Sequence, residues 1–242
     1  PPVHSFFIFS DVFYTFLVEN NCWWARERQK DPNTFLEGNE DVRNRILQGE
    51  FPQYIVTRFS DMLDYFGNSP IIVRSSSLLE DNFGNAFAGK YEGVFCANQG
   101  TKQERLNYFI SAVRFIYAST MSDEALTYRK TRGVLDKDEQ MALLVQRVSG
   151  IPYNHYFFPQ LAGVAFSFNP FVWNKEIDPE AGVIRLVFGL GTRAVDRADD
   201  DYTRIVALNV PEKRPDADFD EVKRHAQRRV DILDLHLNTF AN

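Results

Sequence analysis

The sequence predicts an α+β protein in which helical segments come first and most strands follow. Residues 1–67 carry apolar side chains at helical spacing, and a strong amphipathic pattern returns over 102–120. Four segments after residue 140 are short apolar runs bounded by Gly, Pro, Asn or Asp, as buried strands are. Helices and strands do not alternate in strict βαβ order, and this favours the α+β class.

Three helices are expected before the first strand. Ser10 and Asp11 can cap the first of them. Its apolar positions include Val12, Phe13, Phe16 and Leu17. Two further helices are predicted over 38–48 and 53–66, and the Gly-Asn-Ser-Pro run at 67–70 then breaks the pattern.

Two strands and two helices are predicted in the middle of the chain. The strands are expected over 71–73 and 91–97, and the polar, glycine-bearing segment 75–90 between them is expected to be a loop. Amphipathic helices are predicted over 102–120 and 122–131.

The rest of the chain is expected to form a largely buried sheet followed by one helix. The predicted strands are 141–148, 163–168, 183–188 and 204–210. Residues 217–240 have apolar side chains at helical spacing and are predicted to be an amphipathic helix. The 22 Phe residues are spread along the chain, so we interpret them as core.

Composition and charge exclude several classes of function. The net charge of −6 gives no indication of binding to nucleic acid or to an anionic membrane. No run of 18 apolar residues is present, so no membrane span is expected. Cys22 and Cys96 lack metal-ligand spacing and are expected to be buried free thiols in a reducing, cytoplasmic compartment. The chain starts with Pro and has no signal-peptide pattern, which suggests a segment of a longer protein.

The most informative segment lies between Val73 and Gly93. Arg74 follows a predicted strand, and its planar guanidinium suits phosphate oxygens. Three serine hydroxyls and three glycines come after it, at Ser75, Ser76, Ser77, Gly84, Gly89 and Gly93. Glycines let backbone N–H groups approach phosphates, but these three match neither a Walker loop nor GxGxxG. Taken alone, an Arg before serines is more often a surface turn.

Four motifs, in this order, resemble the N-terminal ATP-grasp domain of pyruvate phosphate dikinases, phosphoenolpyruvate synthases and rifampin phosphotransferases. The first is Val-Arg-Ser-Ser, then Glu-Asp, then Phe-Ala-Gly, within 73–89. The other three are Leu-Val-Gln-Arg-Val at 144–148, Ala-Gly-Val-Ala-Phe-Ser-Phe-Asn-Pro at 162–170 and Gly-Leu-Gly at 189–191. The resemblance implies an ATP-grasp-like domain with a mixed, mainly antiparallel sheet. It implies a helical N-terminal part over 1–67 and ATP-grasp lobes, incomplete at the C-terminus, over 68–242.

The resemblance also implies a set of ligand-binding residues. They are Arg74, Gly89, Lys90, Gln146, Arg147, Ser149, Gly163 and Ser167. Arg74 would contact ATP phosphates and act in catalysis, and Gly89 would lie in the loop that closes over them. Gln146, Arg147 and Ser149 would lie beside the adenine, partly through backbone groups. Ser167 stands where the family usually has Thr.

Each of these assignments has a structural alternative. Gly89 can serve only to allow a positive φ before a strand, and Gln146 can be a satisfied buried amide. Gly189 and Gly191 can shape a loop near the nucleotide or form a simple turn. The carboxylate run at 199–201 is interpreted as a solvated loop rather than a metal site.

The mechanism that the resemblance implies is phosphoryl transfer from ATP to a histidine. Magnesium accompanies ATP, and the histidine lies on a separate swivelling domain that serves a further substrate-binding domain. The chain's own histidines, His4, His155, His225 and His236, lie in no phosphohistidine motif and are interpreted as ordinary surface or core residues. The family's upstream Gly-Gly-Lys lysine and downstream Asp-x-Glu and Gln-x-Arg strands are absent. Magnesium ligands are therefore expected beyond the C-terminus, and this segment alone is expected to be inactive.

Departures from the family pattern leave other functions open. Gly93 replaces a Thr, Leu78 stands where a Thr is usual, and Lys90 stands where Gln is common. Lys90 can restore positive charge near the phosphates. One alternative is a degenerate nucleotide-binding regulatory module. Others are a dikinase that acts on an antibiotic or a glucan, and a helical interaction domain whose motif matches are accidental.

Overall fold

The computed structural model describes residues 4–77, 79–80, 91, 93–195 and 201–242. The chain divides into two compact units, Pro1–Val148 and Ser149–Asn242, and each is described by itself. Helices and antiparallel strands together confirm the α+β class. Among the described residues, no helix combines the length and the apolar character needed to cross a bilayer.

The helices of the first unit agree closely with the periodicity of the sequence. They are α1 (Ser10–Glu19), α2 (Trp23–Gln29), α3 (Asn39–Gln48), α4 (Gln53–Phe66), α5 (Lys102–Ser119) and α6 (Asp123–Thr131). The predictions over 38–48, 53–66, 102–120 and 122–131 are confirmed, whereas α2 was not predicted. The predicted cap of α1 is wrong: Phe9 occupies the cap position without a side-chain hydrogen bond, and Ser10 already lies inside the helix.

The first unit also contains a four-stranded antiparallel sheet in the order β1-β4-β2-β3. Its strands are β1 (Ser5–Ile8), β2 (Ile71–Ser77), β3 (Gly93–Cys96) and β4 (Met141–Arg147). The interpretation of all of 1–67 as helical is therefore wrong for residues 5–8, which pair with β4. Their aromatic and β-branched side chains suit a pleated strand. β2 is also longer than expected, because the serines after Arg74 continue its ladder with β4.

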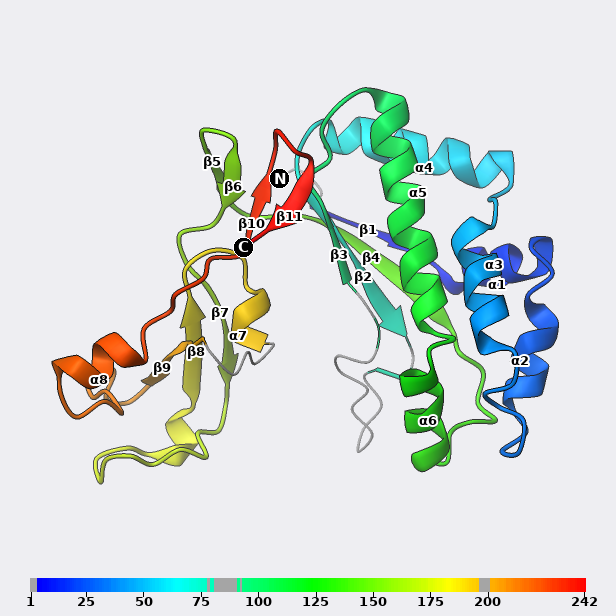
Figure 1. Cartoon of the computed structure of the whole chain (residues 1–242). Coiled ribbons are helices and arrows are strands. Elements are labelled where there is room, and N and C mark those ends of the chain that lie inside the picture. The colour runs from blue at the N-terminus through cyan, green and yellow to red at the C-terminus, as the bar shows by residue number, and fades with distance from the viewer. Residues whose placement is uncertain (1–3, 78, 81–90, 92, 196–200) are drawn as a thin grey trace. The chain divides into compact units, whose positions relative to one another are not determined.

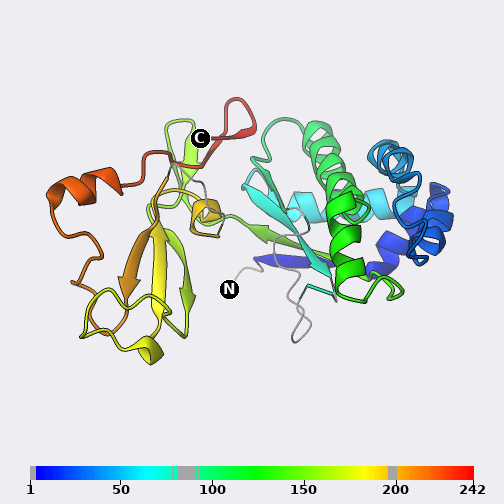
Figure 2. The same cartoon turned by 60° about the horizontal axis from the view of Figure 1, so that its bottom comes forward.

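One face of this sheet is packed against the helices and forms the core. Figure 1 and Figure 2 show the helices of the first unit gathered on one side of the sheet. The fully buried strand residues on that side include Ile71, Val73, Leu143 and Val145. They share a core with helix residues such as Phe13, Phe16, Phe109, Ile116 and Tyr117. Burying each such side chain contributes about 1.5–3 kcal/mol. The interpretation of the Phe residues as core is confirmed for these three, but it is wrong for others such as Phe9 and Phe219, which are 70% and 79% exposed.

The second unit consists of two small antiparallel sheets and short helices. One sheet has the order β11-β10-β6-β5, with β5 (Ile151–Tyr153), β6 (Tyr156–Phe158), β10 (Ile232–Asp234) and β11 (Thr239–Ala241). The other has the order β7-β8-β9, with β7 (Ala162–Phe166), β8 (Val183–Val187) and β9 (Arg204–Ala207). The helices are η1 (Pro179–Ala181), α7 (Thr192–Val195) and α8 (Phe219–Arg224). Every pairing between the described strands of both units is antiparallel.

Two predictions for the second unit are wrong. The helix expected over 217–240 ends at Arg224, and the chain then forms the hairpin of β10 and β11, in which Asn238 has a φ of +53°. Phe219 is 79% exposed, so the helix-spaced apolar residues do not form one buried stripe. The expected burial of the later sheet also fails, because most residues of β7 are exposed.

Candidate functional site

The face of the first sheet that points away from the helices carries the residues of greatest interest. Side chains alternate between the two faces along each strand, so Ile72, Arg74 and Ser76 of β2 lie on this face. The register places Arg74 opposite Leu144 on β4 and opposite Gly93 on β3. We call this surface the open sheet face. Its other members are Ser5, Phe7, Ala142, Leu144, Gln146, Gly93 and Phe95.

Arg74 is the positively charged group of the open sheet face. Its side chain is exposed, and among the described residues it has no hydrogen-bond or ion-pair partner. Gly93 lies beside it: a Cβ atom placed on this glycine would be 3.9 Å from Cγ of Arg74. No described carboxylate neutralises the guanidinium, so its five donors are available to an anionic ligand.

Gln146 lies on the same face as Arg74. It is half-buried and pairs with Ile72 of β2 on one side and Ser5 of β1 on the other. Its Nε2 donates a hydrogen bond to Oγ of Ser5 at 3.2 Å. Gln146 is the diagonal neighbour of Arg74 across the β2–β4 pair, a spacing of about 7–8 Å. One ligand can therefore contact both residues and the apolar surface of Ile72 and Leu144 between them.

Two of the three serine hydroxyls are used inside the protein. Oγ of Ser75 donates to Oε1 of Glu80 at 2.7 Å, and Oγ of Ser77 donates to the Glu139 carboxylate. Only Ser76 shares a face with Arg74. Of the three serines noted in the sequence, one therefore has its side chain on the face of Arg74.

Arg147 belongs to the opposite face. Its guanidinium donates to Oγ of Ser69 and lies 5.4 Å from the centre of the Phe66 ring. Its backbone N–H donates to the carbonyl of His4 at 2.9 Å. These contacts hold β4 to its neighbours, and they turn the Arg147 side chain away from Arg74 and Gln146.

The remaining described residues of the predicted site lie in the second unit. Ser149 and Ser167 are exposed, outside regular strands. Gly163 lies in β7 opposite Leu186 of β8. A Cβ on Gly163 would lie 2.3 Å from the Arg185 carbonyl oxygen, so close strand packing requires glycine at this position. Leu186 also lines a mainly apolar cavity of about 720 Å³ between β8, β9 and α8.

The Gly-Leu-Gly segment is held against Asp231, the residue before β10. Gly189 has a φ of +96°, and the backbone N–H of Leu190 donates to the Asp231 carbonyl at 2.8 Å. A Cβ on Gly189 would lie 2.7 Å from the same carbonyl oxygen, so only glycine fits. The glycine thus has a structural reason that does not depend on a nucleotide.

The prediction of a solvated carboxylate run is wrong for Asp201. Its side chain is 4% exposed and forms an ion pair with Arg193 at 3.0 Å, while Arg193 also pairs with Asp231 at 2.7 Å. A buried carboxylate requires such partners, because desolvation without them is costly. Asp199, Asp200, Gly89, Lys90 and Leu78 lie outside the described residues.

Metal-binding groups are scarce in the part of the chain that is described. There, no group of three or more His, Cys, Asp or Glu side chains could hold a metal ion. The four histidines are exposed. Cys22 and Cys96 are buried free thiols, as predicted, and burial raises the pKa of Cys96 to about 12. The described residues therefore do not form a magnesium site.

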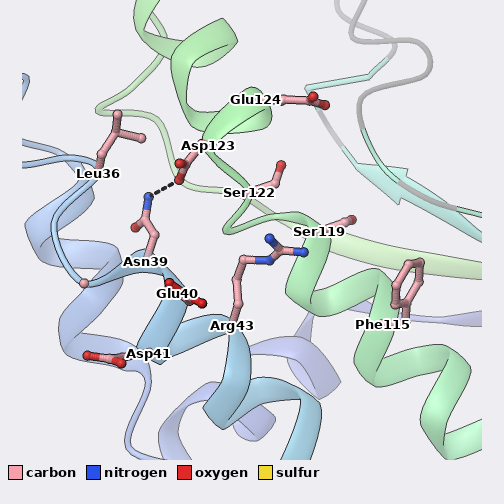
Figure 3. A pocket seen from close by; sticks show the side chains of 11 residues that line it. Leu36, Asn39, Glu40, Asp41, Arg43, Phe115, Ser119, Ser122, Asp123 and Glu124 are labelled. Atoms are coloured by element: carbon pink, nitrogen blue, oxygen red, sulfur yellow. Dashed lines mark hydrogen bonds between the residues drawn. The ribbon is translucent and has the colours of Figure 1, made fainter.

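A separate cavity of about 800 Å³ lies among the helices of the first unit (Figure 3). In Figure 3, Arg43 of α3 extends toward Ser119 of α5, and Asn39 donates a hydrogen bond to Asp123 at 3.2 Å. The cavity is lined by four carboxylates, those of Glu40, Asp41, Asp123 and Glu124, against the single guanidinium of Arg43. This charge balance disfavours a triphosphate. None of the residues predicted for the nucleotide site lines this cavity.

Sequence reasoning missed two parts of this region. Ser5 and Phe7 of β1 enlarge the open sheet face, and Phe7 is 61% exposed. The aromatic and β-branched residues Phe6, Phe7 and Ile8 were the available signal, but the neighbouring helical pattern obscured it. Glu139, which binds Ser77, was also missed, because it lies 62 residues farther along the chain.

Comparisons with known proteins identify the family of the chain. The family model described as "Pyruvate phosphate dikinase, AMP/ATP-binding domain" matches residues 1–235. An uncharacterized phosphotransferase of Bacillus subtilis (strain 168) is 28% identical over 182 residues, which are 74% of this chain and 19% of that protein. The rifampicin phosphotransferase of the same organism is 26% identical over 156 residues, 64% of this chain and 16% of the relative.

A third relative extends the comparison to another activity. The phosphoenolpyruvate synthase of Deinococcus radiodurans is 26% identical over 201 residues, 78% of this chain and 23% of the relative. The chain thus spans about a fifth of the length of the curated relatives that it matches. The match of the family model over nearly the whole chain shows that it belongs to the family of the pyruvate phosphate dikinase AMP/ATP-binding domain.

Proposed function

We propose that the chain is the ATP-binding part of a phosphotransferase, with the phosphates of ATP on Arg74 at the open sheet face. The observation that carries this proposal is the exposed Arg74 guanidinium, which shares that face with Gln146 and has no partner among the described residues. A guanidinium fork matches phosphate oxygens and binds them with charge-assisted hydrogen bonds. The family match supports a nucleotide as the ligand.

The base of the nucleotide has a suitable surface beside Arg74. Ile72 and Leu144 are half-buried apolar residues of the open sheet face, and Phe7 adds an exposed aromatic ring. Flat apolar walls with a few polar groups are typical of nucleotide sites. Gly89 and Lys90 belong to the proposal as further contacts. Arg147 belongs to it only through its backbone groups, because its side chain lies on the opposite face. For Ser149, Gly163 and Ser167, contact with the nucleotide stays a prediction from the resemblance. The division into a helical N-terminal part, residues 1–67, and ATP-grasp lobes, residues 68–242, also belongs to the proposal.

The reaction that we propose for the full-length protein is transfer of a phosphoryl or pyrophosphoryl group to a histidine on a separate domain. A phosphorus–oxygen bond of ATP breaks, a phosphorus–nitrogen bond forms, and ADP or AMP leaves. Arg74 would bind the phosphate oxygens and offset their negative charge as the bond breaks. The relatives are a phosphoenolpyruvate synthase and a rifampicin phosphotransferase, so the final acceptor can be a small metabolite or an antibiotic.

Labelling with radioactive ATP tests this reaction. The full-length protein, incubated with ATP labelled in the γ- or β-phosphate, is expected to acquire an acid-labile, alkali-stable label that is typical of phosphohistidine. ATP labelled only in the α-phosphate is the control and should leave no label. The variant Arg74→Ala should lose most of the labelling. A protein that binds ATP and yet acquires no label from any position would contradict the transfer.

One observation favours a different function, nucleotide binding without transfer. Gly93, directly opposite Arg74, carries no hydroxyl, and two of the three serine hydroxyls are bound to Glu80 and Glu139. The described residues around Arg74 therefore offer few side-chain donors. ATP binding without labelling in the experiment above would support this regulatory role.

A further inference from the structure

A buried carboxylate joins the two strand ends next to Arg74. Glu139 is 1% exposed and lies just before β4. Its Oε1 accepts a hydrogen bond from Oγ of Ser77, and its Oε2 accepts one from the hydroxyl of Tyr91. Ser77 is the last residue of β2, and Tyr91 comes two residues before β3. Glu139 thus connects the end of one strand to the start of the next.

This connection lies immediately beyond Arg74. The last residue pair of the β2–β3 ladder is Arg74 with Gly93. Past this pair, no further β2–β3 pairing joins the described residues. β2 stays paired with β4 as far as Ser77, so the unpaired side of its end is the one toward β3. Strand edges without a ladder open readily, and the tie between Ser77 and Tyr91 limits such opening on that side.

A second carboxylate supports the same strand end. Glu80 accepts hydrogen bonds from Oγ of Ser75 at 2.7 Å and from the backbone N–H of Ser77 at 2.8 Å. The backbone N–H of Leu79 donates to Oγ of Ser77 at 3.0 Å, and the Leu79 side chain is buried. The end of β2 is therefore tied on both sides, by Glu80 locally and by Glu139 from a distant part of the chain.

Glu139 is held in place by positively charged neighbours. Nη1 of Arg129 lies 3.6 Å from Oε2 of Glu139, and neither side chain is accessible to solvent. Nη2 of Arg129 and Nη2 of Arg26 both donate to the Lys137 carbonyl, at 2.7 Å and 3.2 Å. Burial, followed by the charge of Glu139, raises the pKa of Tyr91, so the Tyr91 hydroxyl keeps its proton and remains a donor. The ion pair and two hydroxyl donors compensate the desolvation of the carboxylate.

We propose that Glu139 is a positioning residue for phosphate binding: it ties Ser77 to Tyr91 and thereby holds the β2–β3 end in the conformation that presents Arg74. This inference rests on the proposed function, in which Arg74 binds the phosphates. Among the described residues Arg74 has no side-chain partner that fixes its direction. Its direction therefore depends on the backbone that Glu139 stabilises.

A double-mutant cycle tests the proposal. The 242-residue chain and the variants Glu139→Gln, Arg74→Ala and the double variant are titrated calorimetrically with ATP and with inorganic triphosphate. Glu139→Gln keeps the side-chain volume and is expected to lower the affinity for both ligands about tenfold. In the Arg74→Ala background, Glu139→Gln should lower these affinities less than about twofold, because the side chain that Glu139 positions is absent.

Two controls separate positioning from general destabilisation. Glu104→Gln removes an exposed carboxylate that caps α5 in the same unit, and it should leave ATP affinity unchanged. Tyr91→Phe removes a single bond to Glu139 and retains the ion pair with Arg129, so it should fold even if Glu139→Gln does not. Tyr91→Phe is expected to weaken ATP binding when Arg74 is present and to have a smaller effect in the Arg74→Ala background. Glu139→Gln and Tyr91→Phe should each lower the melting temperature by the same amount whether or not Arg74→Ala is also present.

The outcomes distinguish this inference from the proposed function. If Arg74→Ala leaves ATP affinity unchanged, the proposed function fails. A second outcome is that Arg74→Ala weakens ATP binding, while Glu139→Gln and Tyr91→Phe fold and bind ATP as tightly as the unmodified chain. In that case only the positioning role fails. Additive effects of Glu139→Gln and Arg74→Ala would also overturn it, because independent sites add.

Discussion

Arg74 is exposed because of its position in the two-residue period of β2. Ile71 and Val73 point to the core, and Arg74 lies on the other face. The sequence predicts a strand that ends at Arg74, whereas β2 continues through Ser77. The continuation is paired with β4 and is supported by Glu80 and Glu139, which accept hydrogen bonds from the hydroxyls of Ser75 and Ser77. Distant partners of this kind cannot be read from local periodicity.

At Gly93, substitution by alanine is expected to stabilise the first unit by about 0.4–1 kcal/mol. Gly93 lies in β3 and does not have a positive φ. A Cβ there would lie 3.7 Å from the Val73 carbonyl oxygen, an ordinary contact. Alanine reduces the conformational freedom of the unfolded chain without strain. Urea unfolding of Gly93→Ala should show a higher midpoint at an unchanged slope. A lower midpoint would show that the glycine is needed for the fold.

Among the elements, the strands predicted over 141–148, 163–168, 183–188 and 204–210 are present as β4, β7, β8 and β9, whereas the short strands β1, β5, β6, β10 and β11 were not predicted. The periodicity of α3, α4, α5 and α6 is local, and their predicted ranges are confirmed. The residues of β1 pair with β4, and those of β10 pair with β6, which are distant in the chain. For 217–240, a helix-like spacing competed with these pairings, and packing of Leu233 opposite Phe157 prevailed over it.

The N-terminus of α5 gives a prediction at the scale of the element. Thr101 accepts a hydrogen bond from the N–H of Glu104 at 3.3 Å, and Glu104 accepts one from the N–H of Thr101 at 2.8 Å. This capping box satisfies two otherwise unpaired donors. Thr101→Ala is expected to lower the free energy of unfolding by about 1 kcal/mol.

Chemical denaturation measures this change. Ser111→Ala, at an exposed hydroxyl within α5, is the matched control and should change stability less than Thr101→Ala. Equal effects of the two substitutions would mean that the cap does not stabilise the unit.

At the scale of the whole molecule, the sequence predicted the family better than the details of the site. The four motifs indicated the family that the comparisons confirm. Arg74 and Gln146, which are distant in the chain, lie on one face because β2 and β4 are neighbours. The resemblance implies a place beside the adenine for both Gln146 and Arg147, yet the side chains of adjacent strand residues point to opposite faces. Ser5, Phe7 and Glu139 were missed because only the folded chain brings them to this region.

Calorimetric titration of the 242-residue chain with ATP tests most directly the claim that Arg74 on the open sheet face binds the phosphates. The unmodified chain is expected to bind ATP, and Arg74→Ala is expected to bind it roughly 10- to 150-fold more weakly, the loss of one charge-assisted contact. Arg58→Ala, which removes another guanidinium that is 84% exposed in the same unit, should bind as the unmodified chain does. Equal affinities of Arg74→Ala and the unmodified chain, or no binding of ATP by the folded chain, would contradict the claim.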